Sequence, residues 1–156
     1  MNPRVETTIE VLKLTFNDHI TFQKICQFVE VIRNKPLIIE ADAMPLGLTG
    51  YCIPLSDVDL ICYRERSRDM DLLSQLHEIG HILLGHIDSP SNMPAYNNFI
   101  REKERIAHSP SVIKYRGMQF DDPEEHDAEA LATLLLGLIL HTESELSPVA
   151  RELYGD

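Results

Sequence analysis

Residues 74–86 have the sequence SQLHEIGHILLGH, and the order His77, Glu78, Ile79, Gly80, His81 within them determines how the rest of the chain is interpreted. On an α-helix, side chains four positions apart lie one above the other, so His77 and His81 are able to bind one divalent ion from the same side. Glu78 is rotated by one position, from where its carboxylate reaches a water on that ion as a general base. The stretch therefore predicts a helix that carries a hydrolytic metal site.

The apolar residues around this motif predict one buried face of the same helix, formed by Leu72, Leu73, Leu76, Ile79, Leu83 and Leu84. We expect the helix to begin near Asp69 or Asp71 and to end at Gly85, because glycine is common just past a helix end. His86 comes nine positions after His77, which is the opposite side of a continuous helix. We therefore interpret His86 as a structural or exposed residue and not as a third ligand.

The segments before the motif predict two helices followed by a small sheet. Apolar residues recur at helical spacing in residues 7–16 and 20–33. Short β-rich runs bounded by turn residues then predict strands at residues 37–40, 47–53 and 58–63. Strands that come in one run with helices on both sides of it are typical of the α+β class, which we expect here.

A second helix that bears carboxylates is predicted near the C-terminus. Residues 88–122 form a long irregular segment, and residues 124–139 read EEHDAEALATLLLGLI after a proline that suits a helix start. A two-histidine zinc site that hydrolyses peptides needs one further protein ligand and an open position for water. Glu125, Asp127 and Glu129 are the candidates for that ligand.

The three candidates differ in the face of the helix that they occupy. Glu125 and Glu129 share a face, so one would bind the metal while the other hydrogen-bonds the distal nitrogen of a ligand histidine. Asp127 is rotated away from both. The competing interpretation is an acidic first turn that only compensates the helix dipole. The residues themselves leave this choice open.

Composition predicts one compact domain over residues 1–156, with no direct binding to nucleic acid. The chain has 14 Lys and Arg against 25 Asp and Glu, and this net charge of -11 repels a phosphate backbone. Three cysteines without C-x-x-C spacing favour a reducing compartment. The start of the chain lacks the pattern of a secretory signal, and the apolar run at residues 131–140 is too short to cross a membrane. We therefore expect a cytoplasmic protein without membrane contact.

The stretch HEIGHILLGH followed by an E-x-x-A-E-x-L-A helix resembles the ImmA/IrrE metallopeptidases, over about residues 20–140. The sequences LIIEADAMPLGLTGYCI and YRGMQFDDPEEHDAEALATLLL are similar to the segments that precede the two site helices in that family. The resemblance implies a zincin-like, gluzincin-like domain. The family's ligand glutamate and the residues after it match Glu125, Glu129, Leu131 and Ala132, with Glu129 where Asn is common. This match implies that Glu125 is the third ligand.

The resemblance implies a zinc-dependent intracellular endopeptidase that cleaves a DNA-binding repressor or regulator. One Zn²⁺ would be held by His77, His81 and Glu125, with Glu78 as the base. Candidates for stabilising the oxyanion are Tyr63, Tyr96, His108, Tyr115, Arg116 and His126. One alternative is a non-catalytic metal-binding module that docks to a partner regulator, as a component of a toxin-antitoxin pair or a mobile element. Another is a metal-dependent hydrolase of a small molecule.

Overall fold

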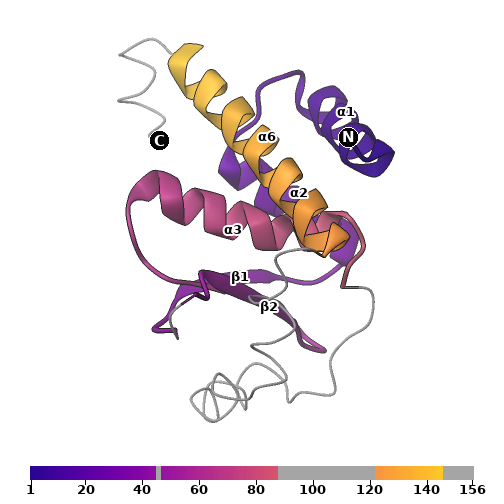
Figure 1. Ribbon diagram of the computed structural model, residues 1–156. Helices are drawn as coiled ribbons and strands as arrows, with labels where there is room; N and C mark the ends of the chain where they lie inside the picture. The colour runs from indigo at the N-terminus through magenta and orange to yellow at the C-terminus, as the bar shows by residue number, and fades with distance from the viewer. Residues whose placement is uncertain (45–46, 88–121, 146–156) are drawn as a thin grey trace.

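The computed structural model describes residues 1–44, 47–87 and 122–145, which form four helices and one three-stranded sheet (Figure 1). In chain order the elements are α1 (Pro3–Phe16), α2 (Phe22–Arg33), β1 (Leu37–Ala41), β2 (Gly50–Pro54), β3 (Asp59–Tyr63), α3 (Arg68–Leu83) and α6 (Pro123–Glu145). The predicted α+β class is confirmed. The irregular segment predicted at residues 88–122 lies outside the described residues, except for Asp122.

The sheet is mixed and has β3 at its centre, in the order β1-β3-β2. Strand β3 runs parallel to β1, with Leu37 opposite Asp59, and antiparallel to β2, with Gly50 opposite Tyr63. Within the described residues β2 is therefore an edge strand. Successive side chains along a strand point to opposite faces of the sheet. On β3, Ile61 therefore packs into the helical core, while its neighbours Leu60 and Cys62 belong to a second apolar cluster on the other face. The second cluster consists of Leu48, Tyr51, Ile53, Leu55, Val58, Leu60 and Cys62.

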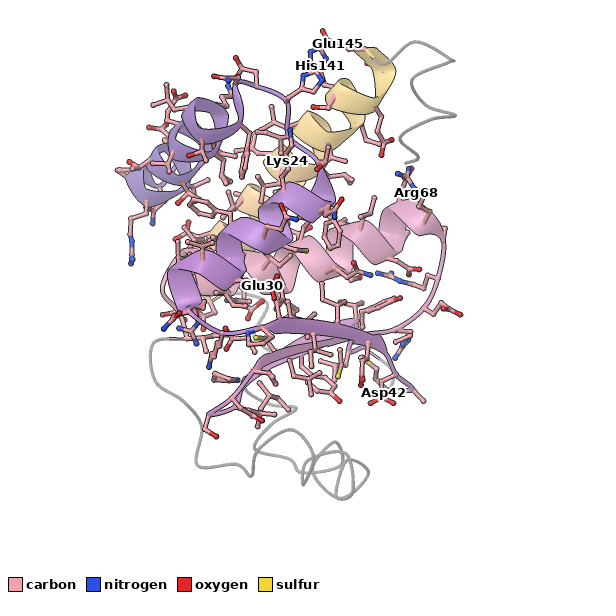
Figure 2. All side chains as sticks on the ribbon, turned by 180° about the vertical axis from the view of Figure 1, so that it is seen from behind. Lys24, Glu30, Asp42, Arg68, His141 and Glu145 are labelled. Atoms are coloured by element: carbon pink, nitrogen blue, oxygen red, sulfur yellow. The ribbon has the colours of Figure 1, made fainter. Side chains whose placement is uncertain are left out.

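Helix α3 lies between the sheet and α6, and it contacts both (Figure 1). Helix α2 contacts α3 and β1, while α1 contacts α6. The Glu30 carboxylate of α2 accepts a hydrogen bond from the Leu37 N–H at the start of β1 (3.0 Å). Glu30 is labelled in Figure 2, which views the molecule from the side opposite to Figure 1. Residues with less than 2% exposure in this helical core include Leu12, Ile25, Leu76, Ile79, Leu131 and Leu135. The central position of α3 gives the HEIGH motif packing partners on two sides.

The ends of the helices follow capping residues more closely than apolar periodicity. Helix α1 begins at Pro3, four residues before the predicted start, because the Asn2 side chain accepts a hydrogen bond from the Arg4 N–H (2.8 Å). Helix α3 begins at Arg68 after Ser67, whose hydroxyl accepts from the Met70 N–H (3.4 Å). Helix α6 continues six residues past the predicted end at Ile139, to Glu145.

No helix in the described parts of the chain has both the length and the apolar character to cross a membrane.

Candidate metal centre

Helix α3 places the rings of His77 and His81 side by side on the face that meets α6. Their Nε2 atoms lie 3.2 Å apart, and their ring planes are nearly perpendicular. His81 is fully buried, and the His77 side chain is 18% exposed. Two imidazole nitrogens in this arrangement face the same point in space, as one shared ion requires.

Glu125, from the first turn of α6, lies between the two histidines. Its Oε2 atom is 2.7 Å from His77 Nε2, and its Oε1 atom is 3.1 Å from His81 Nε2. One ligand atom from each of the three residues lies within 4.8 Å of the others. Two imidazole nitrogens and one carboxylate are the donor set of catalytic zinc sites, so these residues fit a single metal ion.

The close crossing of α3 and α6 at Gly80 explains how Glu125 reaches the histidines. A Cβ atom on Gly80 would lie 3.0 Å from the Ala128 carbonyl oxygen and 3.3 Å from its Cα, both atoms of the α6 backbone. Ala128 follows Glu125 by three positions, and so faces α3 with it. The absence of a side chain at Gly80 therefore sets the helix separation, and with it the distance from the carboxylate to both rings.

The other two predicted carboxylates occupy different positions. Glu129 Oε2 lies 2.9 Å from His77 Nδ1, the nitrogen that points away from Glu125. Asp127 is directed toward α1, where it accepts a hydrogen bond from Asn2 Nδ2 (2.7 Å). The structure thus brings Glu125 and Glu129 to opposite sides of the His77 ring and holds Asp127 elsewhere.

His86 contacts His81, and sequence analysis missed this contact. Helix α3 ends at Leu83, so the helical spacing that placed His86 opposite His77 does not extend to His86. Gly85 adopts a left-handed conformation (φ 77°), and the chain turns back so that the His86 N–H donates to the His81 carbonyl oxygen (2.8 Å). The two Nδ1 atoms also lie 2.8 Å apart. Both site histidines therefore have a polar partner on the nitrogen away from Glu125.

Glu78 is buried beside the sheet, with 2% of its surface exposed. A Cβ atom on Gly50, the first residue of β2, would lie 3.5 Å from Glu78 Cγ and 3.6 Å from Oε1. The glutamate thus lies between the HEIGH helix and the edge strand, and Gly50 leaves room for it there. Glu78 is therefore shielded from bulk water on the same helix as the two histidines.

The electrostatics of the centre favour a positive charge among the three residues. Burial alone would lower the pKa of His77, but hydrogen bonds to Glu125 and Glu129 outweigh burial and raise this pKa to about 10. Burial of Glu125 acts to raise its pKa, yet hydrogen bonds to His77 and His81 lower it to about 2. The hydrogen bond to His77 also lowers the pKa of Glu129. Glu125 and Glu129 are therefore arranged to stabilise a positive charge. When no metal is bound, that charge is the protonated His77 ring.

The predicted candidates for stabilising an oxyanion are dispersed. Tyr63 lines a cavity bordered by α2 and the start of α3, away from the two site histidines. His126 is an exposed residue on α6. The remaining candidates, Tyr96, His108, Tyr115 and Arg116, lie outside the described residues.

The resemblance to the ImmA/IrrE family rests on the motifs alone. Searches against protein-family models and against curated protein sequences found no match to this chain. Family membership and the zincin-like fold therefore remain predictions, whereas the grouping of His77, His81 and Glu125 is a feature of the structure.

Proposed function

We propose that this protein is a zinc-dependent peptidase with a zincin-like site, in which His77, His81 and Glu125 hold one Zn²⁺ and Glu78 is the general base. One observation carries the proposal. Three ligand atoms of the His₂Glu set lie within 4.8 Å of one another, and helix α3, which carries the two histidines, also carries the buried Glu78. A purely structural zinc site has no need for that fourth, non-ligand carboxylate.

The roles of the residues follow from their positions. A Zn²⁺ ion held by His77, His81 and Glu125 would supply a Lewis acid that activates water for attack. Glu78 takes a proton from the attacking water and passes it to the leaving amine as the peptide bond breaks. Glu129 and His86 hydrogen-bond the Nδ1 atoms of His77 and His81, which leaves both Nε2 lone pairs for the metal.

The position of Glu78 beside a strand edge favours an extended peptide as the substrate. Strand β2 is at the edge of the sheet among the described residues, and its Gly50 lies against Glu78. A peptide that adds to this edge through main-chain hydrogen bonds would pass the base. The resemblance narrows the class of substrate to an intracellular DNA-binding regulator, which this acidic protein would recognise without touching nucleic acid itself.

Metal analysis and a cleavage assay with matched variants test the proposal. We expect about one zinc per chain in the purified protein. We also expect it to cleave its DNA-binding regulator, with the products identified by mass spectrometry. Glu78→Gln keeps the ligands and the size of the side chain, so it should bind zinc normally and lower the cleavage rate by at least about a hundredfold. Glu124→Gln alters an exposed glutamate in the first turn of α6 and should leave both properties unchanged.

Two results would refute the peptidase proposal. Cleavage by Glu78→Gln at the normal rate removes the assigned base. Stable binding of the regulator without cleavage by the zinc-loaded wild type instead supports a docking module in which the metal is structural.

A further inference from the structure

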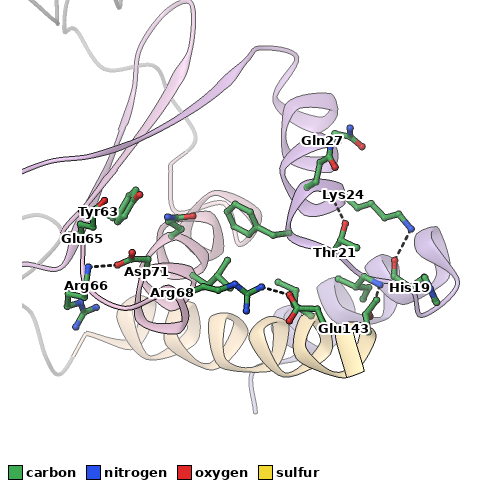
Figure 3. Close-up of a pocket in the computed structure, with 17 residues that line it drawn as sticks. His19, Thr21, Lys24, Gln27, Tyr63, Glu65, Arg66, Arg68, Asp71 and Glu143 are labelled. Atoms are coloured by element: carbon green, nitrogen blue, oxygen red, sulfur yellow. Dashed lines mark hydrogen bonds and ion pairs between the residues drawn. The ribbon is translucent and has the colours of Figure 1, made fainter. Parts of the chain in front are cut away.

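A cavity of about 1160 Å³ lies apart from the metal centre (Figure 3). It is bordered by the N-terminus of α2, the end of β3, the start of α3 and the last turns of α6. Its apolar wall is formed by Ile20, Phe22, Leu72 and Ile139. None of His77, Glu78, His81 and Glu125 lines it. This volume lies slightly above the range of about 300–1,000 Å³ that is usual for small-molecule pockets, so it is large enough for several linked residues of a ligand.

Gln75 presents its side-chain amide to this cavity. The residue is only 8% exposed and lines the cavity, yet among the described residues no group hydrogen-bonds its side chain. The amide nitrogen and oxygen are open to the cavity and are not among the fully buried unpaired atoms of the described residues, so they are available to a ligand. Because an amide both donates and accepts, its natural complement is another amide, such as a peptide unit.

The N-terminus of α2 is the second polar feature of the cavity. Thr21 caps the helix by accepting from the Lys24 N–H (3.2 Å), and the first turn contains no acidic side chain. In the described part of the chain, no acceptor bonds the N–H groups of Phe22 and Gln23, which border the cavity. Free N–H groups at the positive end of a helix dipole bind carboxylates and other anions.

The charged side chains around the cavity balance one another and disfavour a polyanion. Three basic and three acidic residues line it, namely Lys24, Arg66, Arg68, Glu65, Asp71 and Glu143. Figure 3 shows that several are engaged: Lys24 Nζ donates to the His19 carbonyl oxygen (3.0 Å), and Arg68 pairs with Glu143. A ligand with one carboxylate and an apolar body fits this lining better than a nucleotide or a polyphosphate.

We propose that this cavity binds the free C-terminus of a short peptide. The carboxylate lies at the N–H groups of Phe22 and Gln23, and a peptide unit of the ligand pairs with the Gln75 amide. The apolar C-terminal side chain packs against Leu72 and Ile139. The proposal is independent of the peptidase function, because it uses no residue of the metal centre.

Titration of the ¹⁵N-labelled full chain, with or without zinc, tests the proposal. The probes are N-acetylated tetrapeptides ending in leucine, valine or phenylalanine, each as the free acid and as the C-terminal amide. We expect the acids to produce saturable shifts of the Phe22 and Gln23 N–H signals and of the Gln75 side-chain signals. The amides should bind about tenfold more weakly, because they lack the charge.

Gln75→Leu separates a ligand-binding role from a structural one. Replacing an amide that is open to the cavity should change the melting temperature little, while the acid peptides should bind at least about fivefold more weakly. The proposal is overturned by the absence of saturable shifts at millimolar acid peptide, by equal affinity for acids and amides, or by unchanged binding to Gln75→Leu. Free leucine that binds as tightly as the tetrapeptides would also overturn it, in favour of a small-molecule site.

Discussion

His86 and His81 are joined twice at the end of α3, through the His86 N–H and His81 carbonyl oxygen (2.8 Å) and through their Nδ1 atoms (2.8 Å). Gly85 makes this geometry accessible with its left-handed φ of 77°, and its own N–H donates to the Ile82 carbonyl oxygen (3.1 Å). These two backbone bonds define a Schellman motif, in which the residue after the glycine lies over the last full turn of the helix. The motif therefore places His86 where its ring meets Nδ1 of His81.

Removing the His86 ring should weaken zinc binding. In His86→Ala the Nδ1 atom of His81 loses its partner, and losses of this kind typically lower metal affinity about 10–100-fold. Competition with a chromogenic chelator measures the change. His141→Ala, which removes an exposed histidine on α6 paired with Glu145, is the matched control and should bind zinc like the wild type. Equal affinities for the two variants would show that His86 does not support His81.

Two glycine-to-alanine substitutions should have opposite effects on stability. In Gly80→Ala the new Cβ meets the Ala128 backbone at 3.0 Å, so α6 must shift, at a cost of about 1–3 kcal/mol that exceeds the gain in helix propensity. Gly137→Ala, on α6, meets no atom within 4 Å and should gain about 0.5–1 kcal/mol. Urea unfolding measures both changes.

The same pair of variants tests whether the helix crossing sets the metal site. Because Glu125 shares the α6 backbone with Ala128, Gly80→Ala should also weaken zinc binding, and Gly137→Ala should not. A Gly80→Ala protein that is as stable as the wild type, with unchanged zinc affinity, would contradict the assigned role of this contact.

Much of the fold was predictable because its elements depend on local patterns. Apolar spacing identified helices α2 and α3, and the β-rich runs identified the three strands of the sheet. The start of α1 at Pro3 was missed although two signals mark it: Val5 extends the apolar spacing of Ile9 and Leu12 by one turn, and Asn2 followed by proline is a capping signal. Pattern locates an element well, whereas the hydrogen bonds of the caps decide where it ends.

Without the family resemblance, which implied Glu125, the site was predictable only as far as single helices reach. His77, Glu78 and His81 follow from positions on one helix, and the shared face of Glu125 and Glu129 follows from positions on another. Which carboxylate lies between the histidines depends on how the helices cross, and no one-dimensional pattern contains the close approach at Gly80. His86 could have been found, since glycine at the end of α3 is the signal of the turn that brings it to His81.

A buried carboxylate on β3 should be essential for stability. Asp59 is 1% exposed, and it accepts from Arg33 through both oxygens (2.8 and 3.0 Å) and from Lys35 (2.9 Å). Asp59→Asn leaves both cations without their charge partner in a desolvated site, at a cost of about 3 kcal/mol in the free energy of unfolding. Urea titration measures the loss. Asp18→Asn is the control, because this exposed residue has a left-handed conformation (φ 63°) that asparagine also tolerates.

The metal-free protein should owe part of its stability to the His77–Glu125 pair within a defined pH window. His77, whose pKa rises from 6.5 to about 10, contributes stability in full below pH 6.5, and this stability is lost as the pH rises through 10. Glu125, whose pKa falls from 4.5 to about 2, contributes above pH 4.5, and this is lost as the pH falls through 2. The difference in unfolding free energy between wild type and Glu125→Gln should therefore be largest between pH 4.5 and 6.5.

Zinc binding should release the proton that His77 carries. Since the pKa of His77 in the metal-free protein is about 10, the ring is protonated at neutral pH and must lose its proton to coordinate an ion. Calorimetry in buffers with different ionisation enthalpies should therefore report release of about one proton at neutral pH. The apparent affinity should also rise about tenfold per pH unit below the pKa. Binding without proton release would mean that His77 is neutral in the metal-free protein, and that Glu125 and Glu129 do not stabilise a charge on its ring.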